Sequence, residues 1–138
     1  MKALMYDGLE LGIFERDNEG VLRFHKHENI PATWLPYMFD INKDKNMEIV
    51  IKAWIKERIF PKDRIGSIFL VRKLGLKKYD ADKIAEITRC SILTDPYWLA
   101  YTDEDTYTNN SARGKMGGTE YPYNSLDIRN EEDYIWRI

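Results

Sequence analysis

The N-terminal part of the chain alternates between apolar and polar positions with the period of two that is typical of β-strands. Residues 9–15 show this alternation most clearly, and an Asp-Gly pair at residues 7–8 precedes them. Asp-Gly is a strong two-residue hairpin signal because glycine readily adopts positive φ. A polar turn then leads into a third apolar segment at residues 21–25. The pattern predicts an antiparallel three-stranded meander over residues 1–27.

The middle of the chain changes to the helical period of 3.6 residues. The strongest helix signal is an apolar stripe formed by Met47, Val50, Ile51, Trp54 and Ile55. Pro61 is expected to end this helix, because proline lacks a backbone N–H and restricts the residue before it. An irregular turn of helix is expected earlier, over residues 32–39, in a stretch that Pro31 and Pro36 interrupt.

Two further helices are expected after Pro61. The first covers residues 62–74, ends at Gly75, and is expected to place four side chains in the core: Ile65, Ile68, Phe69 and Val71. The second covers residues 81–89 and is capped by the side-chain oxygen of Asp80. Beyond Pro96 the chain is rich in Asp, Asn, Ser and Gly, which predicts irregular structure. Alternation around Tyr134 and Trp136 indicates a short closing strand.

These elements predict an α+β fold. A small antiparallel β-meander (residues 1–27) packs on a helical core of three to four helices (28–100), followed by a loop-rich acidic and aromatic segment (101–138). A length of 138 residues fits a single domain.

Charge is unevenly distributed, although the net charge of the whole chain is only −2. Residues 43–90 carry a net charge of +6, between flanking segments of −3 (1–42) and −5 (91–138). The single cysteine, Cys90, allows no intramolecular disulfide, and no apolar run approaches the roughly 20 residues of a membrane span. We therefore expect a cytoplasmic protein without a membrane partner.

A polar group is expected inside the helical core. Arg58 follows Trp54 by four residues, which places both on one helix face, where the guanidinium can stack on the indole. Asp95, in a Thr-Asp-Pro turn, is a candidate partner for Arg58. Arg64 and Trp98 complete the residues that we assign to this structural polar core. Such groups fix packing geometry rather than catalyse a reaction.

No convincing catalytic or metal-binding pattern accompanies this core. His25 and His27 have a spacing that suits a metal, but even with Glu28 the set lacks a fourth ligand. The glycine-rich residues 114–119 lack the order of glycine, lysine and Ser/Thr that a phosphate-binding loop requires. We predict a non-enzymatic protein without a cofactor or a metal.

Two surfaces are candidates for binding. One is acidic and aromatic, and its assigned contact residues are Tyr101, Asp103, Glu104, Asp105, Tyr107, Tyr121, Tyr123 and Trp136. Tyrosine and tryptophan are common interface anchors, and carboxylates attract basic partners. The alternative, that the rings cap the core while the acids stay solvated, remains open. The other surface comprises the basic helices of residues 62–90, which resemble a helix-turn-helix and suggest DNA binding.

The motifs together resemble a known family. The segments Leu-Met-Tyr-Asp-Gly at 4–8, Leu-Gly-Ile-Phe at 11–14 and Gly-Val-Leu-Arg-Phe at 20–24 resemble the start of HipA-type kinases. Trp-x3-Arg-x2-Pro-x2-Arg at 54–64 and Leu-Thr-Asp-Pro-Tyr-Trp at 93–98 resemble the N-terminal region of HipA-like proteins from Firmicutes. The resemblance covers about residues 3–101. It implies a stand-alone counterpart of the N-terminal subdomain without the kinase machinery, and separately encoded versions can serve as antitoxins.

The leading prediction is a regulatory module that binds another protein, such as an antitoxin-like regulator of a HipA-like kinase. A second prediction is an anti-defence protein of a phage or mobile element, which would inhibit a host nuclease such as a CRISPR effector. A third is a DNA-binding regulator that uses residues 62–90. A protein partner ranks above nucleic acid, and the sequence leaves a homodimer open.

Overall fold

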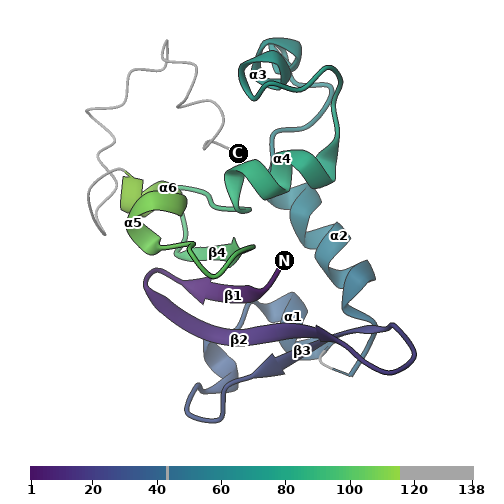
Figure 1. Cartoon of the computed structure of the whole chain (residues 1–138), viewed down its shortest axis with the longest axis vertical. Helices are drawn as coiled ribbons and strands as arrows, with labels where there is room; N and C mark the ends of the chain where they lie inside the picture. Colours follow the sequence, from purple (N-terminus) through teal and green to yellow (C-terminus); the bar gives the residue numbers. More distant parts are fainter. Residues whose placement is uncertain (43, 116–138) are drawn as a thin grey trace.

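A computed structural model describes residues 1–42 and 44–115. Within them, a four-stranded antiparallel sheet lies beside a group of helices (Figure 1), which confirms the α+β prediction. The strands are β1 (Ala3–Tyr6), β2 (Leu9–Arg16), β3 (Leu22–Lys26) and β4 (Tyr97–Ala100), in the spatial order β3-β2-β1-β4. The helices are η1 (Ala32–Trp34), α1 (Tyr37–Ile41), α2 (Met47–Arg58), α3 (Ser67–Lys73), α4 (Ala81–Thr88), α5 (Tyr107–Asn110) and α6 (Ala112–Lys115).

The meander forms as the alternation predicts. Asp7, with a φ of 46°, makes the tight turn between β1 and β2, and Tyr6 pairs with Leu9. Alternate residues of β1 face opposite sides of the sheet, as strand geometry requires. Leu4 therefore joins the main core under the helices, whereas Ala3 packs on the other face with Trp98.

Gly12 of β2 lies so close to β3 that no side chain fits at this position. A Cβ at this position would lie 2.5 Å from the carbonyl oxygen of His25 and 2.5 Å from Cζ of Phe24. We expect Gly12→Ala to lower the free energy of unfolding by about 2–3 kcal/mol, because overpacking next to the backbone cannot relax easily. Gly8→Ala is the matched control in the same meander, since a Cβ there meets nothing within 4 Å. Equal chemical denaturation midpoints for the two variants would contradict this expectation.

The helix α2 carries the predicted apolar stripe into the core. All five stripe residues are buried, and the Asn46 side chain caps the first turn by accepting a hydrogen bond from the Glu48 backbone N–H at 3.0 Å. The helix ends at Arg58, three residues before Pro61. Phe39 of α1 packs edge-on against Trp54, which ties α1 to α2.

The segment after Pro61 differs from the prediction. Residues 61–66 form turns, and α3 begins only at Ser67, after Gly66 with a φ of 84°. Gly75 ends the helix as predicted, in the left-handed conformation. The late start changes the buried face: Leu70 and Val71 point inward, while Ile65, Ile68 and Phe69 are exposed. The predicted burial is confirmed for Val71 and wrong for the other three residues.

The helix α4 begins at its predicted cap, where the backbone N–H of Lys83 donates to Oδ1 of Asp80 at 3.2 Å. It ends in two successive residues with left-handed backbone, Arg89 (φ 57°) and Cys90 (φ 52°). This turn directs the chain from the helices back to the sheet. There β4 pairs with β1, so that Leu99 lies opposite Leu4.

The C-terminal part of the described chain is more ordered than the irregular structure expected there. The sequence analysis missed β4, because Tyr97–Ala100 is too short and too uniformly apolar to show alternation. It also missed α5 and α6, which lie beside β4 (Figure 1). Ser91 Oγ accepts the backbone N–H of Ala112 at 2.8 Å, which attaches α6 to the connector before β4. The expected strand at 134–136 lies outside the described residues.

Candidate interaction surface

Arg58 joins the helices to the edge of the sheet. Its side chain is 6% exposed, and its two terminal nitrogens donate to the two carboxylate oxygens of Asp95 at 2.6 and 2.7 Å. The same guanidinium donates to the carbonyl oxygens of Cys90 at 2.7 Å and Tyr97 at 2.8 Å. Its Cζ lies 4.3 Å from the centroid of the Trp54 ring. The pairing of Arg58 with Asp95 and Trp54 is therefore as the sequence predicts.

The other two members of the predicted polar core lie elsewhere. Arg64 is partly exposed in the turn before α3. Trp98 is fully buried, but on the opposite face of the sheet from Trp54, and its indole N–H donates to the carbonyl oxygen of Asp7 at 2.8 Å. Successive residues of β4 point to opposite faces, which is why Trp98 and Arg58 do not meet. The prediction of one shared polar core is wrong for Trp98, which lies on the other face of the sheet.

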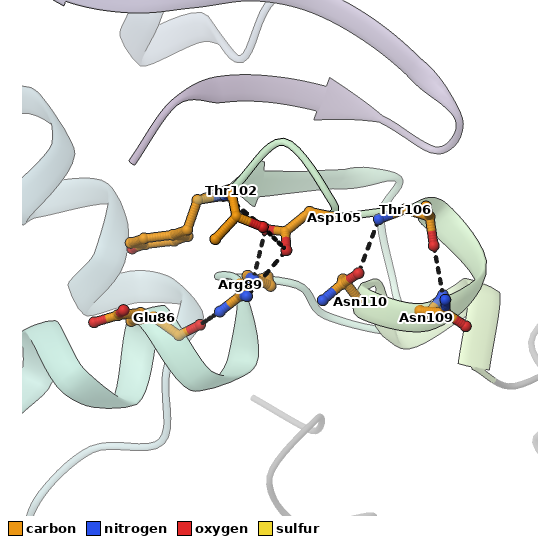
Figure 2. A network of polar contacts seen from close by, with 8 residues as sticks. Glu86, Arg89, Thr102, Asp105, Thr106, Asn109 and Asn110 are labelled. Carbon is orange, nitrogen blue, oxygen red and sulfur yellow. Dashed lines mark hydrogen bonds and ion pairs between the residues drawn. The ribbon is translucent and has the colours of Figure 1, made fainter.

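A second, partly buried ion pair joins Arg89, at the end of α4, to Asp105 in the turn after β4 (Figure 2). Arg89 donates to both carboxylate oxygens of Asp105, from Nε at 2.8 Å and from Nη2 at 3.0 Å. Asp105 also accepts the backbone N–H of Tyr101 at 2.7 Å and the hydroxyl of Thr102 at 2.9 Å. Arg89 Cζ stands 5.3 Å from the centroid of the Tyr101 ring. This network stabilises the turn that leads from β4 to α5.

The network changes the interpretation of the predicted acidic and aromatic surface. The Asp105 side chain is only 3% exposed, and Tyr101 packs against the main core, so both residues support the fold and the surface prediction is wrong for them. Tyr107 packs partly against the Trp98 cluster, Asp103 pairs with Lys2, and Glu104 is exposed. Tyr121, Tyr123 and Trp136 lie outside the described residues. Of the predicted contact residues that the structure describes, Asp103 and Glu104 are therefore the acids that lie on the surface.

Asp105 makes the stability of the protein depend on pH. Burial alone would raise its pKa, but the hydrogen bonds from Arg89, Tyr101 and Thr102 lower the pKa from 3.8 to about 2. A carboxyl with a lowered pKa stabilises the fold above its unfolded value, and this contribution is lost as the pH falls from about 4 to about 2. We expect Asp105→Asn to cost about 2 kcal/mol at pH 6 and much less at pH 2.5. Urea unfolding at both pH values measures this, with Glu104→Gln as the control; a cost that does not change with pH would contradict the assignment.

Three exposed apolar side chains lie in and just before α3, which stands at the far end of the molecule from the β2–β3 hairpin (Figure 1). Ile65 is 100% exposed, Phe69 is 63% exposed and Ile68 is 47% exposed. We call these three residues, together with the charged side chains of residues 62–78, the α3 surface. Isolated exposed apolar residues are common, but three within five positions of a short segment indicate an interaction site.

The α3 surface is firmly attached to the domain. Leu70 and Val71 insert into the core from the opposite side of the helix. The hydroxyl of Ser67 donates to the Lys62 carbonyl at 2.6 Å, which closes the turn before α3. After the helix, Tyr79 donates to the carbonyl oxygen of Phe60 at 2.8 Å, and the two rings pack edge-on. The exposed apolar face therefore belongs to an anchored element.

Positive charge surrounds these apolar residues. Residues 62–78 carry six basic side chains and one acidic side chain, a net charge of +5. An open hollow of about 620 Å³ follows α3, and its charged lining residues are Lys77, Lys78, Lys83 and Asp80. A second group of exposed apolar residues comprises Trp34, Tyr37, Ile41 and Ile49, but residues 37–49 are nearly neutral in charge. The α3 surface is distinguished by combining an apolar centre with a strong net positive charge.

Other grooves and side-chain clusters give weaker indications of a binding site. A groove of about 330 Å³ between α2 and α4 has walls of both signs, including Lys52, Asp82 and Glu86. His27 pairs with Glu10 at 2.6 Å and His25 with Glu15 at 3.5 Å, so the two histidines point to different carboxylates. Among residues 1–42 and 44–115, potential metal ligands nowhere form a group of three. No helix of this part of the chain has the length and apolarity to cross a bilayer.

Comparisons with protein-family models, curated proteins and solved structures find no match. The resemblance to HipA-like kinases therefore stays a prediction that depends on the sequence motifs alone. Sequence analysis missed the α3 surface as an apolar site because it assigned Ile65, Ile68 and Phe69 to the core. The signal available in the sequence is Gly66, a glycine inside the predicted helix of residues 62–74. In the structure Gly66 has a left-handed backbone and α3 begins after it.

Proposed function

We propose that this protein is a non-catalytic interaction module that binds another protein through the α3 surface. The observation that carries the proposal is the exposure of Ile65, Ile68 and Phe69 on an anchored element within a basic segment. Protein interfaces commonly have an apolar centre and a polar rim, and this surface has the same composition. The partner that fits it presents an apolar patch bordered by carboxylates.

The apolar centre favours a protein over nucleic acid. Interfaces with nucleic acid are more polar, and phosphate groups would leave an exposed isoleucine and phenylalanine without apolar contacts. The lysine-lined hollow at Lys77, Lys78 and Lys83 is the one observation that favours the DNA alternative. Binding to a DNA column at low salt tests that alternative. Loss of binding in the double variant Lys77→Ala/Lys78→Ala, together with unchanged binding in Phe69→Asp, would support DNA as the ligand.

The sequence resemblance indicates which partner to test first. If the chain is a counterpart of the N-terminal subdomain of HipA-like kinases, its partner is a HipA-like kinase and its role is that of an antitoxin-like regulator. Inhibition of a host defence nuclease remains the alternative proposal. Its sequence basis was the acidic segment, and two residues of that segment, Tyr101 and Asp105, support the fold instead.

Site-specific photo-crosslinking tests the proposal in cells. A photoreactive phenylalanine analogue replaces Phe69 in one variant and Ile49 in a control variant; Ile49 is 73% exposed on α2. We expect position 69, and not position 49, to cross-link a protein. The purified protein should then bind the parent chain with an affinity that falls at high salt. Equal cross-linking from both positions, or a complex insensitive to salt, would contradict the proposal.

A further inference from the structure

We propose that the groove between α2 and α4 binds a small zwitterionic molecule with an apolar body, of the class of the aliphatic α-amino acids. The lining residues of this groove do not belong to the α3 surface, so the site is independent of the proposed function. Its size, its apolar lining and its unpaired opposite charges support this assignment.

The groove is formed by elements that are distant in the sequence. α2 and α4 meet at an angle (Figure 1), and residues of β2 and β3 and Tyr101, just after β4, complete the lining. Its volume of about 330 Å³ lies at the lower end of the range of roughly 300–1,000 Å³ that is typical of ligand pockets. A second hollow of about 480 Å³ adjoins it, because Lys52, Ile55 and Asp82 line both. The groove therefore suits a small molecule, with room beside it for a longer side chain.

Half of the lining is apolar and firmly held. Ile51 and Ile55 belong to the main core, and Tyr101 packs against that core. Burial raises the pKa of the Tyr101 hydroxyl, so the phenol stays uncharged at neutral pH. An aliphatic group that contacts these residues is removed from water without any rearrangement of the core. The apolar lining residues are Met1, Leu22, Ile51, Ile55 and Tyr101.

Opposite charges line the same groove without pairing with each other. Lys52 projects from α2, whereas Asp82 and Glu86 lie four residues apart on one face of α4. Among the described residues, Lys52 forms no ion pair with either acid. Arg16 and Glu48, the other charged side chains of the lining, pair with each other at 2.5 Å. A ligand with a carboxylate and an ammonium group satisfies both sides at once, with its carboxylate at Lys52 and its ammonium group at the acids.

The same charges disfavour other classes of ligand. A purely anionic ligand such as inorganic phosphate would bind Lys52 but would also face two carboxylates. A purely cationic ligand would meet the ammonium group of Lys52. Each of these ligands gains one attraction and incurs one repulsion, whereas a zwitterion gains two attractions.

Titration of the purified full chain with L-leucine, followed by amide NMR spectra, tests the inference. We expect saturable shifts at the residues that line the groove, with a Kd of about 1 mM or below. Leucinamide lacks the carboxylate, and N-acetyl-leucine lacks the ammonium group. We expect each of these two analogues to bind at least about tenfold more weakly than L-leucine. The amide of Phe69, on the α3 surface, should not shift.

Two variants test the assigned charges. Lys52→Met removes the cation and keeps the length of the side chain, and Glu86→Gln removes one of the two acids. We expect each variant to weaken L-leucine binding about fivefold to tenfold. Lys83→Met is the matched control, because Lys83 is exposed on α4 but does not line the groove, and it should leave Kd unchanged. All three positions are exposed, so the variants should keep the Tm of the parent.

Three results would overturn the inference. The first is the absence of saturable shifts up to about 20 mM L-leucine. The second is equal affinity for L-leucine and leucinamide, because the groove would then recognise a cation alone. The third is an equal loss of affinity in Lys52→Met and Lys83→Met, which would show a general effect of charge instead of a contact with Lys52.

Discussion

Replacing Arg58 with alanine is expected to lower the free energy of unfolding by about 2–4 kcal/mol, which corresponds to a fall of roughly 10 °C in Tm. The substitution removes the four hydrogen bonds that Arg58 donates to Asp95, Cys90 and Tyr97. It also removes the guanidinium that stacks on Trp54 and leaves the Asp95 carboxylate without its cation. Because these contacts join α2 to the α4–β4 connector, the loss should affect unfolding of the whole domain.

Two further variants show whether the hydrogen-bond geometry of Arg58 or its charge is responsible for the stabilisation. Arg58→Lys keeps the charge but cannot form the bidentate contact with Asp95, so we expect it to remain destabilised by at least about 1.5 kcal/mol. Lys56→Ala, at an exposed position of the same helix, should change stability by less than about 0.5 kcal/mol. Urea unfolding of the three variants measures these differences. If Arg58→Ala and Lys56→Ala unfolded at the same midpoint, the assigned role of Arg58 would be wrong.

Elements with a clear local signal were predictable from the sequence. The meander follows from its alternation and the turn at residues 7–8, and α2 follows from a stripe that places five residues on one face. The Arg58–Trp54 contact was predictable because a spacing of four residues places both side chains on the same side of a helix. The caps at Asp80 and Gly75 were predictable for the same local reason.

Features that depend on distant contacts were not predictable. Strand β4 gains its strand character from pairing with β1, more than 90 residues earlier in the chain. Asp105 looks like a surface carboxylate in the sequence, and only the fold brings it to Arg89. The exposed face of α3 depends on where the helix begins, and a shift of its start from residue 62 to Ser67 exposes three residues that a longer helix would bury.

Introducing aspartate at Ile65 and Phe69 together is expected to weaken partner binding by at least about 100-fold. Each substitution replaces an apolar anchor with a charge, and truncation of a central anchor alone typically costs 2 kcal/mol or more. The aspartates also reduce the net charge of residues 62–78 from +5 to +3, which opposes attraction of an acidic partner. Stability should change by less than about 0.5 kcal/mol because both side chains are exposed in the free protein.

We propose that the α3 surface serves binding rather than folding. The most direct test is the Kd of the purified partner, measured by calorimetry for the parent, for Phe69→Asp and for Ile49→Asp, with Tm measured on the same samples. The two substituted residues are both exposed apolar side chains on helices, so they differ mainly in location. We expect Phe69→Asp to raise Kd more than tenfold and Ile49→Asp to leave it unchanged, with no change of Tm in either variant. Equal Kd values for the two variants would show that the α3 surface is not the binding site.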